Sequence, residues 1–339
     1  MSEIDCQRRQ RLAIGLLLIT LLLAVAGLAA GSEGWSLVGL AQTWSGPDGA
    51  LIIGQIRAPR TLGAWLTGAL LGLAGATAQG LFRNPLADPY LLGSASGASL
   101  GVVLVLAASV LGGHAISPAT ADAIARLGLV SAAFAGALLG VLLTLTLARG
   151  AQQTTRLLLA GVVVGMVLSA LSDLVTSAAP DALRGKQAFL LGSTGFLGWS
   201  SCVALAIGLA ITLPLNWRMA RALDALTLGV ESAHSLGLAL PRVRLALVAA
   251  LALATGLAVS QAGLIAFVGL VSPHLVRRFA PAPHGFTLVA SAATGGTLLL
   301  MADVLARTLI APQEVPVGVL TALLGGGYLI WLLHRRRES

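Results

Sequence analysis

Ser96 and His274 are the pair of residues that comes nearest to a pattern for covalent chemistry in this sequence. Ser96 stands in the stretch SASG at an expected helix start, and His274 lies in the stretch VSPHLVRR at the end of a long apolar run. A serine nucleophile needs a histidine base within hydrogen-bonding distance. This pair would therefore be that of an intramembrane serine protease, an alternative that depends on whether the two side chains meet.

Other patterns for catalysis or metal binding are missing from the sequence. A loop of the form G-x-x-x-x-G-K-[ST] would hold the phosphates of ATP, but the only Gly-Lys pair, Gly185 and Lys186, is followed by Gln187. Cys6 and Cys202 form no spacing motif with each other or with a histidine, so neither a disulfide framework nor a metal site is indicated. We therefore expect no catalytic residue, no metal site and no cofactor bound by this chain.

Charged residues within or beside the long apolar runs are the remaining functional candidates, because buried charge is costly in a membrane. Asp173 lies toward the end of one run, where it either lines a pathway or reaches the membrane interface. Asp303 and Arg307 are four residues apart and can pair on one helix face, and their position also suits docking of an external partner. Arg57 and Arg60, in RAPR, are either snorkelling side chains at a helix end or a basic patch for an acidic protein partner.

The elements that must position these residues are membrane helices. Of the 339 residues, 57% are apolar and 10% charged, against about 45–50% and about 25% in a soluble domain. Crossing the bilayer core of about 30 Å takes roughly 20 helical residues, and the charge-free run Leu245–Val276 is long enough to need dividing near Gly263. We predict one domain, 1–339, an all-α polytopic membrane protein with about ten transmembrane helices: 12–30, 61–82, 91–111, 127–148, 157–177, 198–215, 243–261, 264–276, 285–305 and 316–333.

The distribution of basic residues predicts the orientation of these helices. Ten spans place both termini on one side, and if that side is cytoplasmic, fifteen of the 21 Lys and Arg residues fall in inner segments and six in outer ones. The positive-inside rule then predicts that both termini are cytoplasmic. The net charge of +8 reflects this topology, and we infer no nucleic-acid binding from it. The first apolar run, which follows QRRQR, is alternatively a signal peptide, but its length favours a retained span.

Motifs with small residues four apart indicate close helix packing, because small side chains let helix backbones approach. GALLG occurs at 68–72 and 136–140, GASLG at 97–101 and GVVVG at 161–165. Packing within one chain is the simpler interpretation, and a dimer seam is the other. The stretch RNPLADPYLLGSASGASLG, Arg83–Gly101, joins a polar turn to one of these motifs, and we assign it a structural role.

The longest polar stretch expected on the inner side is Asn216–Arg244. It keeps a helical periodicity that is broken at Gly229 and Gly237, which predicts two short helices on the inner surface. Such a connector is longer than the topology requires. We therefore interpret the cytoplasmic segment 216–242 as a docking surface for a soluble protein.

Four segments together resemble one family: RNPLADPYLLGSASGASLG, LGVESAHSLGL, AGLIAFVGLVSPHLVRRFA and ADVLARTLIAPQEVPVGVLTALLGGGYLIWLL. They are similar, in the same order, to segments of the permease subunits of binding-protein-dependent ABC importers for iron–siderophore complexes, haem and cobalamin. The resemblance implies a type II ABC importer permease of ten helices in a bacterial inner membrane. It implies a homodimer around one pathway, two cytoplasmic ATPase subunits that bind ATP and Mg, and one periplasmic substrate-binding protein. It also assigns VSPHLVRR to an importer segment, which argues against the protease.

The resemblance further implies roles for particular residues. Coupling helices that enter a cleft on each ATPase are implied at Leu228, Gly229, Glu231, Ser235, Leu236 and Gly237. Docking of acidic residues of the binding protein is implied at Arg57, Arg60 and Arg307. A cytoplasmic gate is implied at Gln153, Thr154 and Thr155, and a pathway lined by the fifth span with Asp173.

The cargo is predicted less directly. Haem is our best guess because the expected pathway is apolar and poor in aromatic and charged groups, and ferric siderophore or cobalamin stays open. His114, in an expected outer loop, could ligate iron, but a single exposed histidine is more often an ordinary solvated residue. An ion-coupled secondary transporter is the rival mechanism. It would need buried carboxylates for the coupling ion, for which Asp173 is a lone candidate.

Overall fold

The computed structural model describes residues 3–31, 34–35, 44, 46, 48–111, 123–151 and 153–335, most of which are helical. His114 and the last basic residues, Arg336 and Arg337, lie outside the described residues. In chain order the elements are α1 (Glu3–Ala29), β1 (Ala30–Gly31), β2 (Gly34–Trp35), α3 (Gly49–Leu51), the π-helical turn η1 (Ile52–Arg57), α4 (Ala58–Phe82), α5 (Ser94–Leu111), α6 (Ala123–Leu147), α7 (Thr154–Ala178), α8 (Ala182–Leu191), α9 (Trp199–Arg218), α10 (Ala220–Thr227), α11 (Val230–Ser235), α12 (Leu240–Ala262), α13 (Val268–Phe279), α14 (His284–Thr308) and α15 (Val317–Arg335).

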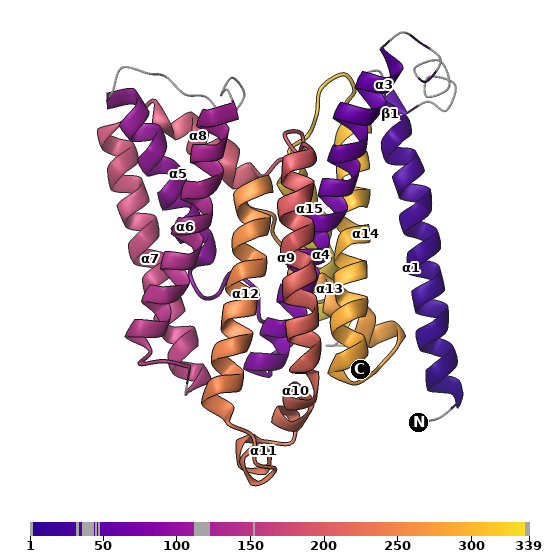
Figure 1. The fold of residues 1–339 in the computed structure, drawn as a ribbon, viewed down its shortest axis with the longest axis vertical. Coiled ribbons are helices and arrows are strands. Elements are labelled where there is room, and N and C mark those ends of the chain that lie inside the picture. Colours follow the sequence, from indigo (N-terminus) through magenta and orange to yellow (C-terminus); the bar gives the residue numbers. More distant parts are fainter. Residues whose placement is uncertain are drawn as a thin grey trace.

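The helices form an elongated bundle in which the long ones run between two ends (Figure 1). The short helix α11 protrudes at one end, in the half of the molecule that also holds both chain termini, and α3 and β1 lie at the other. We call these the α11 end and the α3 end. Among the described residues, strand geometry is confined to two small features. Strands β1 and β2 form a two-residue antiparallel pair, and Ile310 bridges to Gln313.

Each predicted span overlaps a helix, but the helices differ in length. Seven stretches are long and apolar enough to cross a membrane: α1, the run Gly49–Phe82, α6, α7, α9, α12 and α14. The apolar parts of α5 and α15 are shorter, at Ser94–Val110 and Val317–Leu332, and α13 has only 12 residues. The multi-pass membrane character is therefore established, and the number ten stays a prediction.

Helix α4 forms the centre of the bundle and packs against α14, α12, α13 and α9. Its approach to α14 is close because Gly68 and Gly72 have no side chain. A Cβ added at Gly68 would lie 2.2 Å from the carbonyl oxygen of Gly295, and one at Gly72 would lie 2.1 Å from that of Ser291. The same holds between α5 and α6, where a Cβ on Gly97 would lie 2.1 Å from the oxygen of Gly136. These motifs thus pack helices within one chain, as the simpler interpretation predicted.

The polar turn between α4 and α5 is held by its own side chains. Arg83 adopts a left-handed conformation (φ 51°) that ends α4. The Asn84 side chain accepts a hydrogen bond from the N–H of Leu86, and Asp88 accepts one from the N–H of Tyr90 at 2.8 Å. Burial raises the pKa of Asp88, and the bond from Tyr90 offsets part of that rise. The turn is a folded connector, which supports its structural assignment.

The predicted division of the run Leu245–Val276 is confirmed. Helix α12 ends at Ala262, and Gly263 follows with φ 71°, a conformation that other residues rarely adopt. A Cβ at Gly263 would also lie 2.5 Å from the carbonyl oxygen of Phe189, so the chain here passes close to the end of α8. Helix α13 begins five residues further on, at Val268.

Candidate functional site

A cluster of charged side chains lies at the α3 end, where α4 begins and α14 ends. Asp303 is fully buried, and its Oδ1 accepts hydrogen bonds from Nε of Arg60 at 3.0 Å and from the hydroxyl of Thr194 at 2.6 Å. Its Oδ2 forms an ion pair with Arg307. Arg60 also holds Glu314 through both terminal nitrogens, at 2.8 and 2.9 Å. We call these five residues the Asp303 cluster.

The predicted Asp303–Arg307 pair is confirmed, and the cluster is larger than the sequence indicated. For Arg60 the residues left open a snorkelling helix end or a docking patch, and the family resemblance implied docking; most of its side chain is buried against Asp303 and Glu314. Arg307 is only 5% exposed and also donates a hydrogen bond to the carbonyl of Gly27. In this arrangement the charges of both arginines are balanced within the chain. Glu314 was not predicted to belong to a site. The one indication in the sequence was an acidic residue just before the last apolar run.

Arg57 lies one helical turn before Arg60 and has a different environment. Its guanidinium donates to the carbonyl oxygen of Leu28 at 2.9 Å and passes close to Gly31, so it fastens the end of α1 to η1. Among the described residues Arg57 forms no ion pair, which leaves its charge unbalanced. Of the three arginines predicted for docking, Arg57 is the one whose charge is uncompensated in the described structure.

The segment predicted to dock a cytoplasmic protein holds the two expected short helices, α10 and α11. Gly229 (φ 111°) and Gly237 (φ 78°) mark the breaks at the predicted positions. Beside these breaks Leu228 and Leu236 are 70% and 65% exposed. Val230, between them in the chain, is 38% exposed, and exposed apolar residues that gather on one protrusion are candidates for a protein interface.

Other residues that were predicted to couple to an ATPase lie on the same protrusion. Glu231 and Ser235 are exposed on α11, and His234 is exposed as predicted. The protrusion is joined to the bundle through α10, where Asp224 accepts a hydrogen bond from the backbone N–H of His284 at 2.9 Å and lies 2.7 Å from its Nδ1. A force on α11 therefore has a direct route to the first turn of α14.

The predicted gate and pathway residues lie on α7. Gln153 precedes the helix and Thr154 and Thr155 begin it, at the end opposite Asp173. Asp173 has a 75% exposed side chain and pairs with Lys186 of α8 at 2.5 Å. Long apolar residues are exposed along α7, with Met166 the most exposed. This face of α7 is covered by no other described part of the chain.

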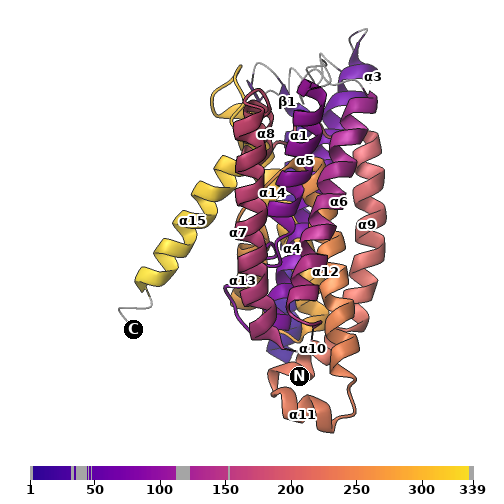
Figure 2. The ribbon, with the colours of Figure 1, turned by 90° about the vertical axis from the view of Figure 1, so that its left-hand side faces the viewer.

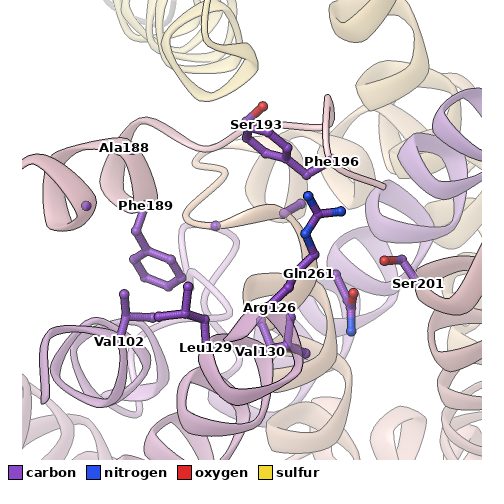
Figure 3. Close-up of a pocket in the computed structure, with 14 residues that line it drawn as sticks. Val102, Arg126, Leu129, Val130, Ala188, Phe189, Ser193, Phe196, Ser201 and Gln261 are labelled. Carbon is purple, nitrogen blue, oxygen red and sulfur yellow. The ribbon is translucent and has the colours of Figure 1, made fainter. Parts of the chain in front are cut away.

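A cavity of about 150 Å³ between α5, α6, α8 and α12 was not predicted. Figure 3 shows the ring of Phe189 over Val102 and Leu129, with Arg126 on the opposite side of the space. The guanidinium of Arg126 lies 5.7 Å from the centre of the Phe196 ring, a cation–π contact that accounts for its position. The cavity is mostly apolar and contains none of the predicted site residues.

The residues of the protease alternative have separate partners. The hydroxyl of Ser96 lies 3.2 Å from that of Ser169 on α7. The ring of His274 packs edge-on against Tyr328 of α15, with the ring centres 5.7 Å apart. Neither contact is that of a nucleophile with its base.

Comparison with known proteins identifies the family. The model of the FecCD transport family matches residues 16–335. The chain is 40% identical over 332 residues to the haemin transport system permease protein HmuU of Yersinia pestis, which covers 97% of both chains. It is 41% identical over 333 residues to the vitamin B12 import system permease protein BtuC of an Escherichia coli strain, which covers 96% of both.

A solved structure agrees with this assignment. The chain is similar to an inward-facing conformation of a metal-chelate type ABC transporter, with a TM-score of 0.81, 27% identity and coverage of 96% of this chain and 99% of the other. The fold and these relatives thus define a multi-pass transport protein of the importer permease class. The chain belongs to the FecCD transport family, and the resemblance seen in the sequence is confirmed.

Proposed function

We propose that this chain is the membrane-spanning permease subunit of an ATP-driven importer, with about ten transmembrane helices and both termini in the cytoplasm of a bacterium. The α11 end then faces the cytoplasm and the α3 end the periplasm. The family match over residues 16–335 and the two permease relatives support this assignment. The positive-inside rule supports the orientation, because the basic N-terminal residues lie at the α11 end.

The observation that carries the proposal is the protrusion of α11, with Leu228 and Leu236 exposed beside it. A permease without nucleotide-binding residues must receive the free energy of ATP hydrolysis from another chain. The exposed leucines, set by two glycine breaks, are suited to enter a cleft on an ATPase subunit. Glu231 and Ser235 would add polar contacts, and ATP and Mg would be bound by the two ATPase subunits.

At the α3 end the proposed partner is a periplasmic substrate-binding protein with acidic docking residues. Arg57 supplies the uncompensated charge for this contact. Arg60 would exchange Glu314 for a carboxylate of the partner. The side chain of Glu314 is half-exposed, so its ion pair with Arg60 is weak. Arg307 would contribute indirectly, because it pairs with Asp303, which also holds Arg60.

Transport follows from alternating access, in which rigid helices open a pathway to one side at a time. Two copies of the chain would face each other across the exposed apolar face of α7 and enclose this pathway. Gln153, Thr154 and Thr155 would form the cytoplasmic gate, and Asp173 with Lys186 would lie at the periplasmic mouth. The chain performs no covalent step in this mechanism.

The proposed cargo is haem, with a ferric siderophore or cobalamin as the alternatives. The haemin permease of Y. pestis and the vitamin B12 permease of E. coli are similar in identity, so the choice rests on the apolar character of the pathway face. No second mechanism is favoured. Ion-coupled transport would need a buried carboxylate free to bind the coupling ion, but the buried Asp303 is paired with Arg60 and Arg307, and Asp173 is exposed and paired with Lys186.

The test is uptake into proteoliposomes that contain this chain, its ATPase and a loaded binding protein, with haem, ferric siderophore and cobalamin as parallel cargoes. We expect haem accumulation that stops when the ATPase is catalytically inactive. Uptake of another cargo alone would overturn the choice of haem and keep the mechanism. Absence of ATP-dependent uptake of every cargo, despite confirmed assembly, would overturn the proposed function.

A further inference from the structure

A crevice between α13, α14 and α15 is not explained by the transport mechanism. Helix α15 leans away from the rest of the bundle toward its C-terminal end (Figure 2). The space that this leaves near the middle of the bundle has a volume of about 210 Å³ and an almost wholly apolar lining. Val271 and Leu275 of α13, Met301 of α14 and Leu324 of α15 are among the residues that line it.

Toward the α11 end the crevice leads to a basic pocket. This second space has a volume of about 380 Å³ and is lined by Pro85, His274, Arg277, Arg278 and Leu332. Lining residues of both spaces come from α13 and α15, with Leu275 and Tyr328 in the crevice and His274 and Leu332 in the pocket. Tyr328 of the crevice also packs against the His274 ring.

The two arginines of this pocket contact neutral groups in the described part of the chain. Arg277 donates a hydrogen bond to the side-chain oxygen of Gln79, a neutral group. The guanidinium of Arg278 lies 5.3 Å from the centre of the Trp331 ring, which is also neutral. Within the described ranges, neither arginine forms an ion pair. Two adjacent guanidinium groups without a carboxylate form a site for an anion.

Tyr328 provides a second, independent indication of a ligand. It lines the apolar crevice, and its hydroxyl is buried without a hydrogen-bond partner in the described structure. A buried hydroxyl without a partner costs on the order of 1–3 kcal/mol. An oxygen atom of a ligand at the junction of crevice and pocket would accept this hydrogen bond.

The geometry matches one half of a bilayer. A rise of about 1.5 Å per residue puts Phe267, at the upper end of the crevice, roughly 16 Å from Arg278 along the axis of α13. Half of a bilayer core is about 15 Å thick. An occupant with its charged group at Arg278 would therefore extend its apolar part to about the middle of the membrane.

We propose that this crevice binds an anionic phospholipid of the inner leaflet, such as phosphatidylglycerol. Its phosphate contacts Arg277 and Arg278, an ester oxygen accepts the hydrogen bond of Tyr328, and one acyl chain fills the space between α13, α14 and α15. Basic pockets between membrane helices on the cytoplasmic side suit such head groups. The lipid would thereby hold α15 at a set distance from the bundle.

Charge and depth favour this occupant over a protein. A second copy of this chain would bring further positive charge to the site, because the inner segments carry most of the arginines. A soluble ATPase subunit could reach the basic pocket at the surface but not the apolar crevice at the depth of Val271 and Met301. A phospholipid satisfies both parts.

Native mass spectrometry of the full chain in detergent tests the proposal, with phosphatidylglycerol, phosphatidylcholine and inorganic phosphate titrated separately. We expect selective retention of phosphatidylglycerol, and a loss of affinity of about 30-fold in R277Q/R278Q, since each basic residue near an anionic leaflet contributes roughly fivefold. The control R218Q/R221Q removes two exposed arginines on the same side that do not line the pocket, and it should bind as the unchanged chain does.

A variant that leaves every charge in place separates a lipid site from a simple anion site. Leu324 is 49% exposed, so L324W should fold and fill the crevice. We expect it to lose phosphatidylglycerol. Equal retention of phosphatidylglycerol and phosphatidylcholine, or unchanged retention in L324W, would overturn the proposal, as would saturation by inorganic phosphate alone. Efficient cross-linking of two L324C chains on a C6S background, without bound lipid, would assign the crevice to a second copy instead.

Discussion

Asp303 and Arg60 are 243 positions apart in the chain, and Arg60 Nε donates a hydrogen bond of 3.0 Å to Asp303 Oδ1. The same carboxylate pairs with Arg307 through its other oxygen. One fully buried negative charge thus holds two arginines at the point where α4 begins and α14 ends. Removing it would leave the buried Arg307 without a carboxylate partner beside Arg60, which would keep Glu314.

D303N should therefore destabilise the chain strongly. Breaking a buried ion pair by removing one partner costs about 3–5 kcal/mol, because the remaining charge is left uncompensated. The check is thermal unfolding of the detergent-solubilised variant. E314Q is the matched control: Glu314 is half-exposed, and its loss should cost within about 1 kcal/mol. Equal destabilisation by the two substitutions would contradict a central role for Asp303.

G72A should disrupt the packing of α4 on α14. The added Cβ would lie 2.1 Å from the backbone oxygen of Ser291, and backbone cannot move aside as a flexible side chain can. Forced overpacking costs about 1–3 kcal/mol, and we expect a lower unfolding temperature and a lower yield of folded protein. G15A is the control, since nothing lies within 4 Å of the Cβ that it adds to α1. A G72A variant as stable as G15A would contradict the close approach of α4 and α14.

Much of the fold followed from local patterns. Charge-free runs predicted helices at the right places because crossing a bilayer requires apolar residues in sequence. Gly263 predicted the break between α12 and α13, because a single glycine in an apolar run can mark a positive-φ conformation that other residues rarely adopt. The glycines of GALLG predicted close packing, although the partners, Gly295 and Ser291, lie far along the chain and could not be named.

The sites could be predicted less completely, because most of their contacts join residues that are far apart in the chain. Asp303 and Arg307 pair within one helix, so their spacing was sufficient. Arg60 and Glu314 join them only through tertiary packing, which no local spacing encodes. The crevice beside α13 depends on the tilt of α15, a property of the whole bundle. The pattern of hydropathy carries no information about it.

D88N should raise the stability of the turn at neutral pH. Burial raises the pKa of Asp88, so the fold disfavours the charged form. An asparagine keeps an oxygen that can accept the hydrogen bond from Tyr90 and carries no charge. D88A loses this acceptor and should cost about 1–3 kcal/mol.

The pH dependence of D88N has a definite sign. Above the raised folded-state pKa the ionised Asp88 penalises folding by the full amount, and the penalty disappears only below the pKa that Asp88 has in the unfolded chain. The advantage of D88N in unfolding temperature should therefore be constant above the raised pKa and shrink as the pH falls through it, because protonated Asp88 is itself neutral. An advantage that grew on acidification would show that the ionised carboxylate stabilises the turn.

R57E should weaken docking of the proposed binding protein and leave assembly with the ATPase intact. Arg57 has no ion-pair partner among the described residues, so reversing its charge changes the docking surface without breaking the Asp303 cluster. Loss of a close interfacial charge pair typically costs about 2–5 kcal/mol, or a fall in affinity of 30-fold or more. Surface plasmon resonance with the immobilised transporter measures it, and R126E, at a cation–π site, is the control. Unchanged affinity in R57E would remove Arg57 from the docking surface.

L228D/L236D should uncouple the permease from its ATPase. Leu228 and Leu236 are exposed, so charging them leaves the bundle folded, but a buried carboxylate at the interface would lack a partner. We expect loss of ATPase co-purification and of ATP-driven uptake, with an unchanged unfolding temperature. L86D serves as the control, because Leu86 is also exposed, at 56%, but lies in the turn between α4 and α5. If L86D abolished assembly and L228D/L236D did not, the ATPase would dock on that turn, and α11 would have another role.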